Sequence, residues 1–98
     1  MNLQAQVTIG WDVSCDYDMN FDANGLQQAI DDGMSELRLT NENEFQTSLN
    51  IRNQIIIKGG YSNCLDAQSD TQTNINSVIN SSINPGFSAV FIFDIMNK

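Results

Sequence analysis

The pattern of hydrophobic and polar positions changes its period near Gly33. Before this glycine, hydrophobic residues recur at helical spacing, at Leu26, Ala29, Ile30 and Met34. The spacing predicts a short amphipathic helix from Gly25 to Asp32, which Gly33 ends. Asn24 and Gln27 have the spacing of a capping box at the start of this helix.

After Gly33, hydrophobic residues alternate with polar ones or form short β-branched runs, which indicates strands. The predicted strands cover residues 7–11 at the start of the chain and then 36–40, 45–51, 55–57, 74–79 and 89–95. Polar residues at 41–44, 62–73 and 84–86 predict the turns and loops between them. The strands centred near Arg38, Ile56, Asn76 and Phe91 lie roughly 15 to 20 residues apart without a crossover helix, which favours stacked parallel coils over a Rossmann-type sheet.

Composition excludes several classes of partner. The 98 residues include 12 acids and 4 bases, with no His, for a net charge of −8. This charge repels phosphate backbones and anionic lipids, so we expect no binding to nucleic acid. No stretch approaches the roughly 20 apolar residues of a membrane span, so we expect no membrane insertion. Most of the polarity comes from 13 Asn and 8 Gln, which are common in parallel β ladders and in disordered segments.

An acidic segment before the predicted helix is a weak calcium candidate. Its residues match the first ligand positions of an EF-hand loop: Asp16, Asp18, Asn20 and Asp22. The sixth position is Phe21 in place of Gly, and the twelfth is Gln27 in place of Glu, so bidentate closure is lost. The alternative is a solvated acidic lead-in to a helix. We therefore expect no metal and no cofactor.

No residue set predicts catalysis. Arg38, Arg52 and Lys58 lie on or beside predicted strands, but no carboxylate pair accompanies them as calcium ligands would in a lyase. The acids cluster in loops and do not form the facing pair of a glycosidase. We expect the chain not to be an enzyme. The aromatic residues that would stack on sugar rings, or else pack over a cap or a turn, are Trp11, Tyr17 and Tyr61.

Cys15 and Cys64 are too few for a structural zinc site, and no His completes one. Two readings remain open on these residues alone. One is a disulfide formed in an oxidising compartment, and the other is a pair of buried thiols.

Four segments occur in a characteristic order: Cys15-Asp16-Tyr17, Leu26-Gln27-Gln28-Ala29-Ile30, Leu37-Arg38-Leu39 and Ile55-Ile56-Ile57-Lys58-Gly59-Gly60-Tyr61-Ser62-Asn63-Cys64. Together they resemble the start of pectin-lyase-like right-handed parallel β-helix proteins, in particular bacterial exported or surface proteins of mostly unassigned function. The resemblance covers residues 7–95. Gly-Gly-Tyr followed by the second Cys is its most specific part.

The resemblance implies a mainly β fold, a short right-handed parallel β-helix of about three to four coils in a single domain over residues 1–98. Residues 1–34 would form an N-terminal strand and capping helix, and residues 35–98 the coils, either as the start of a longer β-helix or as a free-standing miniature. It also implies a Cys15–Cys64 disulfide and an extracytoplasmic location, although residues 1–6 have no signal-peptide features.

These observations favour a non-catalytic structural or interaction module. The final residues are rich in hydrophobic side chains, and an exposed apolar edge strand is a template for pairing with another chain. We expect self-association through this strand, first as a dimer, with interface residues Phe87, Phe91, Phe93 and Ile95. The alternative is a carbohydrate-binding module or a remnant of a polysaccharide-active β-helix protein.

Overall fold

The structure, a computed structural model, describes residues 6–85 and 90–98. Its elements in chain order are β1 (Gln6–Gly10), β2 (Tyr17–Asp18), α1 (Gly25–Asp31), β3 (Glu36–Thr40), β4 (Leu49–Ile51), β5 (Ile55–Tyr61), α2 (Cys64–Gln68), β6 (Ser77–Ile79), β7 (Ile83–Pro85), β8 (Val90–Phe93) and β9 (Ile95–Asn97).

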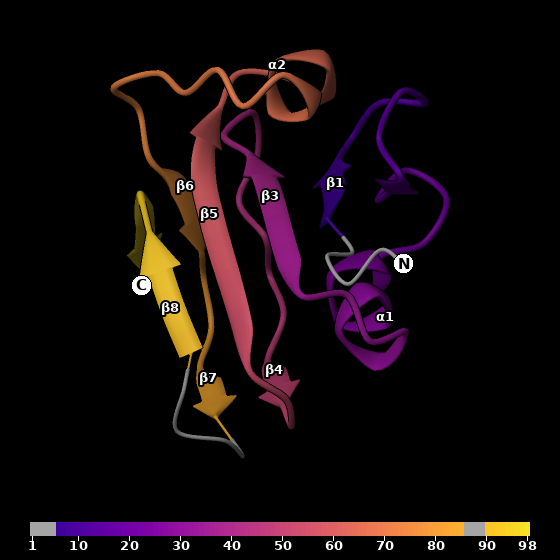
Figure 1. Cartoon of the computed structure of the whole chain (residues 1–98), viewed down its shortest axis with the longest axis vertical. Helices are drawn as coiled ribbons and strands as arrows, with labels where there is room; N and C mark the ends of the chain where they lie inside the picture. The colour runs from indigo at the N-terminus through magenta and orange to yellow at the C-terminus, as the bar shows by residue number, and fades with distance from the viewer. Residues whose placement is uncertain (1–5, 86–89) are drawn as a thin grey trace, which may run out of the picture.

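The described strands form three parallel sheets. The largest has five strands in the order β2-β1-β3-β5-β8, which lie side by side in Figure 1. The other two sheets are the pairs β4-β7 and β6-β9. Every strand pair is parallel. The predicted mainly β fold with parallel strands is therefore confirmed.

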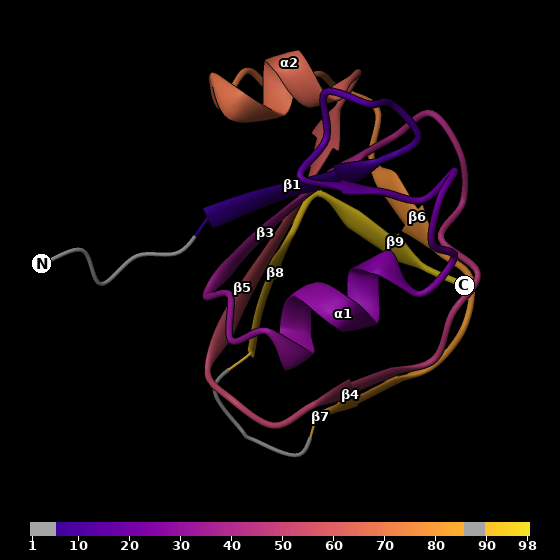
Figure 2. The ribbon, with the colours of Figure 1, turned by 90° about the vertical axis from the view of Figure 1, so that its right-hand side faces the viewer.

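The chain passes through the three sheets in a fixed order. After β3, Phe45 forms a parallel bridge with Ile79 of β6, and β4 follows before the chain returns to the large sheet at β5. The same order repeats from β5 through β6 and β7 to β8, and β9 then continues the sheet of β6. Figure 2 shows the three sheets surrounding a common interior, with α1 lying across one end of it.

The core consists of the inward-facing side chains of these sheets together with one face of α1. In the large sheet Leu37 of β3 lies beside Ile57 of β5, and both are fully buried. Helix α1 buries Leu26, Ala29 and Ile30 against the same cluster. Burial of each large aliphatic side chain stabilises the fold by roughly 1.5–3 kcal/mol. The predicted amphipathic helix is thus confirmed, with its apolar face on the core.

The end of β5 approaches its neighbours closely enough to require glycine. A Cβ at Gly59 would lie 2.6 Å from the backbone oxygen of Asp94 and 2.7 Å from the Cβ of Ser77. Gly60 has φ +87°, a conformation that L side chains rarely adopt. Its N–H donates to Ser77 Oγ at 2.9 Å, and this buried hydroxyl donates to the Leu39 carbonyl at 2.8 Å. The Gly-Gly pair therefore lets three successive segments pack together.

Two predictions about the first helix differ in outcome. Gly33 has φ +87° and its N–H donates to the Ile30 carbonyl, so it ends the helix as predicted. The capping box is wrong, because Asn24 forms no side-chain cap. The Gln27 side chain instead accepts from the Asn50 N–H at 2.8 Å and donates to the Asn50 carbonyl at 3.0 Å. Gln27 therefore ties α1 to β4.

Three predicted loop or strand boundaries are wrong. Residues 62–73, expected as a loop, contain α2, which begins where Asn63 Oδ1 accepts the Asp66 N–H at 2.8 Å. Asn84 and Pro85, expected in a turn, belong to β7, because pairing with β4 extends them. The predicted strand over 89–95 is two strands, β8 and β9, separated by Asp94 at φ 56°.

The disulfide between Cys15 and Cys64 is present, with the two Cα atoms 5.1 Å apart. It joins the segment between β1 and β2 to the first residue of α2. Of the two readings left open by the residues alone, the disulfide is therefore confirmed, in agreement with the family resemblance.

Candidate interaction surface at the carboxy-terminal strands

The last strand of each sheet pairs with one neighbour among the described residues. These strands are β8 in the large sheet, β7 beside β4, and β9 beside β6. All three lie on the side of the molecule opposite β1 and α1 (Figures 1 and 2). We call this side the carboxy-terminal end, defined by β7, β8 and β9. An edge strand of this kind presents backbone N–H and C=O groups that another strand can pair with.

The side chains of β8 divide between the interior and the outer face. Val90 and Ile92 pair in register with Ile55 and Ile57, which are buried in the core. Although Ile92 continues this inward row, 42% of its surface is exposed, because no described strand lies beyond β8. The interior of the fold is therefore accessible at this end.

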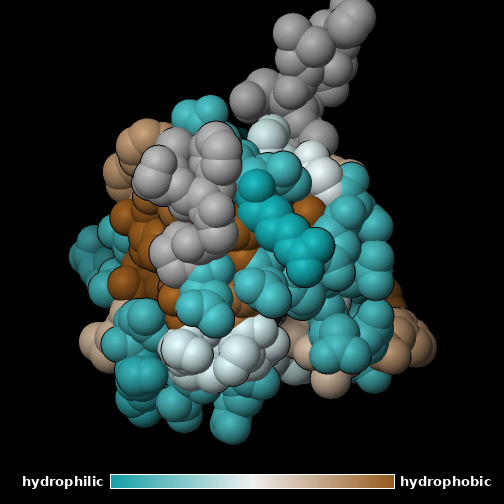
Figure 3. Space-filling model, turned by 90° about the horizontal axis from the view of Figure 1, so that it is seen from below, coloured by the Kyte–Doolittle hydropathy of each residue, from teal (hydrophilic) through white to brown (hydrophobic). Residues whose placement is uncertain are grey.

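The alternate positions of β8 carry two aromatic side chains on the outer face. Phe91 and Phe93 pair in register with Ile56 and Lys58 and are 48% and 51% exposed. Figure 3 shows hydrophobic residues gathered on the left of the face seen from below, the side on which β8 lies in Figure 1. A contiguous exposed apolar patch marks an interaction surface more often than isolated exposed side chains do.

Of the four expected interface residues, Phe91 and Phe93 lie on β8. Ile95 was expected on one face with Phe91 and Phe93, and that expectation is wrong. The turn at Asp94 places Ile95 in β9 beside the buried Ser77, where it packs partly buried against the core. Phe87 lies outside the described residues. Met96, another of the hydrophobic residues crowded near the end of the sequence, is half exposed on β9.

Charge is nearly absent from this end. Residues 74–98 contain Asp94 and Lys98 as their only charged side chains, so the net charge of −8 resides in residues 1–73. Asp94 accepts a hydrogen bond from the Gln72 side chain at 2.7 Å, and Lys98 forms an ion pair with Glu44 at 3.1 Å. The carboxy-terminal end is therefore the part of the molecule that a second acidic chain approaches with least repulsion.

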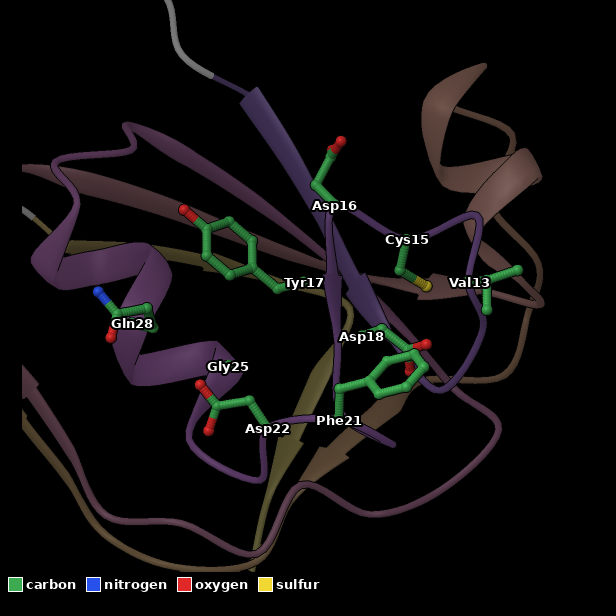
Figure 4. Close-up of a pocket in the computed structure, with 9 residues that line it drawn as sticks. All are labelled: Val13, Cys15, Asp16, Tyr17, Asp18, Phe21, Asp22, Gly25 and Gln28. Carbon is green, nitrogen blue, oxygen red and sulfur yellow. The ribbon is translucent and has the colours of Figure 1, made fainter.

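The calcium candidates do not converge. Asp16 Oδ2 accepts the Thr8 N–H at 2.9 Å and the Thr8 hydroxyl at 3.1 Å. Asp18 and Asp22 each accept a backbone N–H two residues further on, and the Asn20 side chain donates to the Trp11 carbonyl. The three carboxylates line one pocket of about 460 Å³ but point in different directions (Figure 4). Within the described ranges no three metal-ligating side chains gather.

The three aromatic residues considered for sugar stacking serve the fold. Trp11 packs against Phe45, with ring centroids 4.6 Å apart. Tyr61 is fully buried, and its hydroxyl donates to Asp70 at 2.5 Å. Tyr17 is partly exposed and donates to Asp32 at 2.6 Å. Packing over a cap or a turn is therefore the role that the structure favours for them.

The basic residues on the strands pair with acids. Arg38 Nε donates to Glu36 at 2.6 Å, and Arg38 Nη1 donates to the Ala67 carbonyl at 2.8 Å. Lys58 Nζ lies 3.0 Å from Asp70 Oδ1. These contacts tie β3 and β5 to α2 and the segment after it. Arg52 is exposed between β4 and β5.

Acid should destabilise the protein through the tyrosine–carboxylate pairs. Hydrogen bonds from Tyr17 to Asp32, and from Tyr61 and Lys58 to Asp70, hold the pKa of both carboxyls below the ordinary 3.8. A carboxylate whose pKa is lower in the folded state contributes stability above its unfolded pKa, and that stability is lost as pH falls further. The urea concentration at the unfolding midpoint should therefore decrease as the pH is lowered below about 4. This decrease should be less steep in Asp70→Asn than in the wild type. Equal pH profiles for Asp70→Asn and wild type would contradict this role of Asp70.

No protein-family model matches the chain, and neither the curated proteins nor the solved structures include a significant match to it. Over residues 6–85 and 90–98, no helix is long and apolar enough to cross a membrane.

Proposed function

We propose that the chain forms the first coils of a right-handed parallel β-helix and acts as a non-catalytic interaction module that self-associates through its carboxy-terminal strands. The β-helix is supported by the all-parallel pairing and by the fixed order in which the chain passes through the three sheets. The position of α1 across one end supports its role as a cap. In such a stack each coil covers the preceding one, and exposed apolar side chains on the last described strand favour contact with a further layer.

The observation that carries the self-association is the exposed state of β8. Its outer side chains, Phe91 and Phe93, are each about half exposed, and its inward Ile92 lacks a covering layer. Its backbone edge is free to pair, since β5 is its one neighbour among the described strands. Apolar burial and strand pairing therefore favour the same contact.

Light scattering at micromolar concentration should give a mass of twice the 10.9 kDa chain. The double variant Phe91→Ser, Phe93→Ser should bind itself at least about tenfold more weakly, because losing even 1.4 kcal/mol of apolar contact has that effect. Phe21→Ser is the matched control, since Phe21 is 82% exposed in the loop before α1, away from β8. It should keep the wild-type mass.

A wild-type protein that stays folded and monomeric at these concentrations would rule out the proposed function. So would a dimer whose dissociation constant is the same in the wild type and in the double Phe91, Phe93 variant.

A further inference from the structure

Among the described strands, three sheet edges lie together at the carboxy-terminal end, and a partner that covers this end meets all of them. β8 ends the large sheet, β9 ends the sheet of β6, and β7 ends the sheet of β4. The three sheets surround one interior (Figure 2), and the partly exposed Ile92 of β8 continues the inward row of buried Ile57. A partner that paired with β8 alone would leave the interior and two strand edges uncovered.

We propose that the partner is a second copy docked about a two-fold axis perpendicular to the five-stranded sheet, an inference that rests on the proposed self-association. A head-to-tail contact would press this end onto α1 and the two-residue edge strand β2, and no described strand there would pair with β7 or β9. A two-fold contact uses the same surface on both copies and closes it. With the axis perpendicular to the sheet, the outer face of one copy continues as the outer face of the other.

This axis fixes which strands meet. It reverses the strand direction, so β8 pairs antiparallel with β8 of the second copy. In Figure 2 the sheet containing β9 and the sheet containing β7 adjoin opposite ends of the strands of the large sheet. The rotation reverses these strands and so exchanges the places of the two small sheets. β9 of each copy therefore pairs with β7 of the other. All three open edges at each end gain a partner in one contact.

The register of β8 follows from which side chains face inward. Residues directly opposite in an antiparallel pair lie on the same face of the sheet. Pairing Ile92 with Ile92 of the second copy puts Phe91 opposite Phe93 twice, so four rings gather on the outer face. The two Ile92 side chains then cover each other in the interior. This register buries the apolar side chains that β8 exposes.

Charge and size agree with this arrangement. Residues 74–98 carry one acid and one base, so the two facing ends have no net charge, while the −8 of each copy lies away from the contact. Seen from the left of Figure 1, the whole molecule spans 36 by 27 Å. A molecule of this width has room on one side for the roughly 800 Å² that each partner buries in a stable complex.

Cysteine cross-linking tests the axis directly. In the proposed dimer, Ile92→Cys places the two new thiols opposite each other, within disulfide reach. Mild oxidation with diamide should convert most of this variant into a covalent dimer joined at residue 92, with the Cys15–Cys64 bond intact by peptide mapping. Phe21→Cys is the control, since Phe21 lies away from β8 and is more exposed than Ile92, at 82% against 42%, and it should give no covalent dimer.

A second measurement tests the exchange of the smaller sheets. Asn84→Cys on β7 and Met96→Cys on β9 should cross-link when the two variant proteins are mixed, whereas neither should cross-link alone. A dimer by light scattering that forms neither the residue 92 nor the mixed cross-link would overturn this geometry and leave the proposed self-association standing. A monomer by light scattering would overturn both.

Discussion

Replacing Ile30 with Asp should abolish the cooperative unfolding transition of the protein. Ile30 is buried in the core cluster, on a helix that contacts β1, β2 and β4. A carboxylate placed there has no cationic partner, and an unpaired buried charge costs several kcal/mol after relaxation. That cost is comparable to the total stability of about 5–15 kcal/mol that small domains have. The variant should show no sigmoidal transition in urea or on heating.

Ala23→Asp is the matched control. It adds the same charge two residues before Gly25, where α1 begins, at a position that is exposed to solvent. A carboxylate near a helix N-terminus interacts favourably with the helix dipole, so this variant should unfold as cooperatively as the wild type. An Ile30→Asp protein melting within a few degrees of the wild type would show that α1 does not cover the core.

The parts of the fold that the sequence predicts are those with a local periodic signal. Leu37 and Leu39 alternate with polar residues, and both are buried in β3. The helical spacing of Leu26 and Ile30 likewise reports one face of α1. In both elements a single row of side chains faces the core, so the spacing of hydrophobic residues equals the period of the strand or of the helix.

Other elements depend on contacts between distant residues, which a local pattern does not contain. β7 forms because Ile83 to Pro85 pair with Leu49 to Ile51, so the Asn-Pro signal for a turn is overridden. Asp94 adopts a left-handed conformation where its backbone lies against Gly59 and its side chain accepts from Gln72. Helix α2 is five residues long, too short for a periodic signal.

The candidate surface was predicted in part for the same reason. Alternation along β8 correctly separates the exposed Phe91 and Phe93 from the inward Ile92. Extending the same alternation through Asp94 misplaces Ile95, since the turn there changes the direction of the chain. The sequence left Tyr61 open between stacking on a sugar and packing over a turn, because its hydrogen-bond partner Asp70 lies in the loop after α2 and no local pattern indicates that contact.

Removing the disulfide should cost about 4 kcal/mol of unfolding free energy, since Cys15 and Cys64 are 49 residues apart. In the chain-entropy model the bond stabilises the fold by limiting the conformations of the unfolded chain. In the folded state the bond holds the segment after β1 against α2, and Gln68 adds a hydrogen bond to the Ser14 carbonyl at 3.0 Å. The double variant Cys15→Ser, Cys64→Ser should therefore unfold at a much lower urea concentration than the wild type. In the absence of urea, its mass by light scattering should equal that of the wild type.

The reduced wild type serves as the second arm of this experiment, because it has the same side chains without the bond. Reduced wild type and the double serine variant should share one urea midpoint, well below that of the oxidised protein. A gap between them would measure the packing of the buried sulfur atoms, since Cys64 is fully buried and Ser would leave a polar group there. An oxidised protein with the midpoint of the reduced one would show that the bond contributes nothing to stability. The reduced chain unfolds to a more expanded ensemble than the disulfide-bonded chain. Because the m-value increases with the surface exposed on unfolding, the m-value of the reduced protein should be at least as large as that of the oxidised protein.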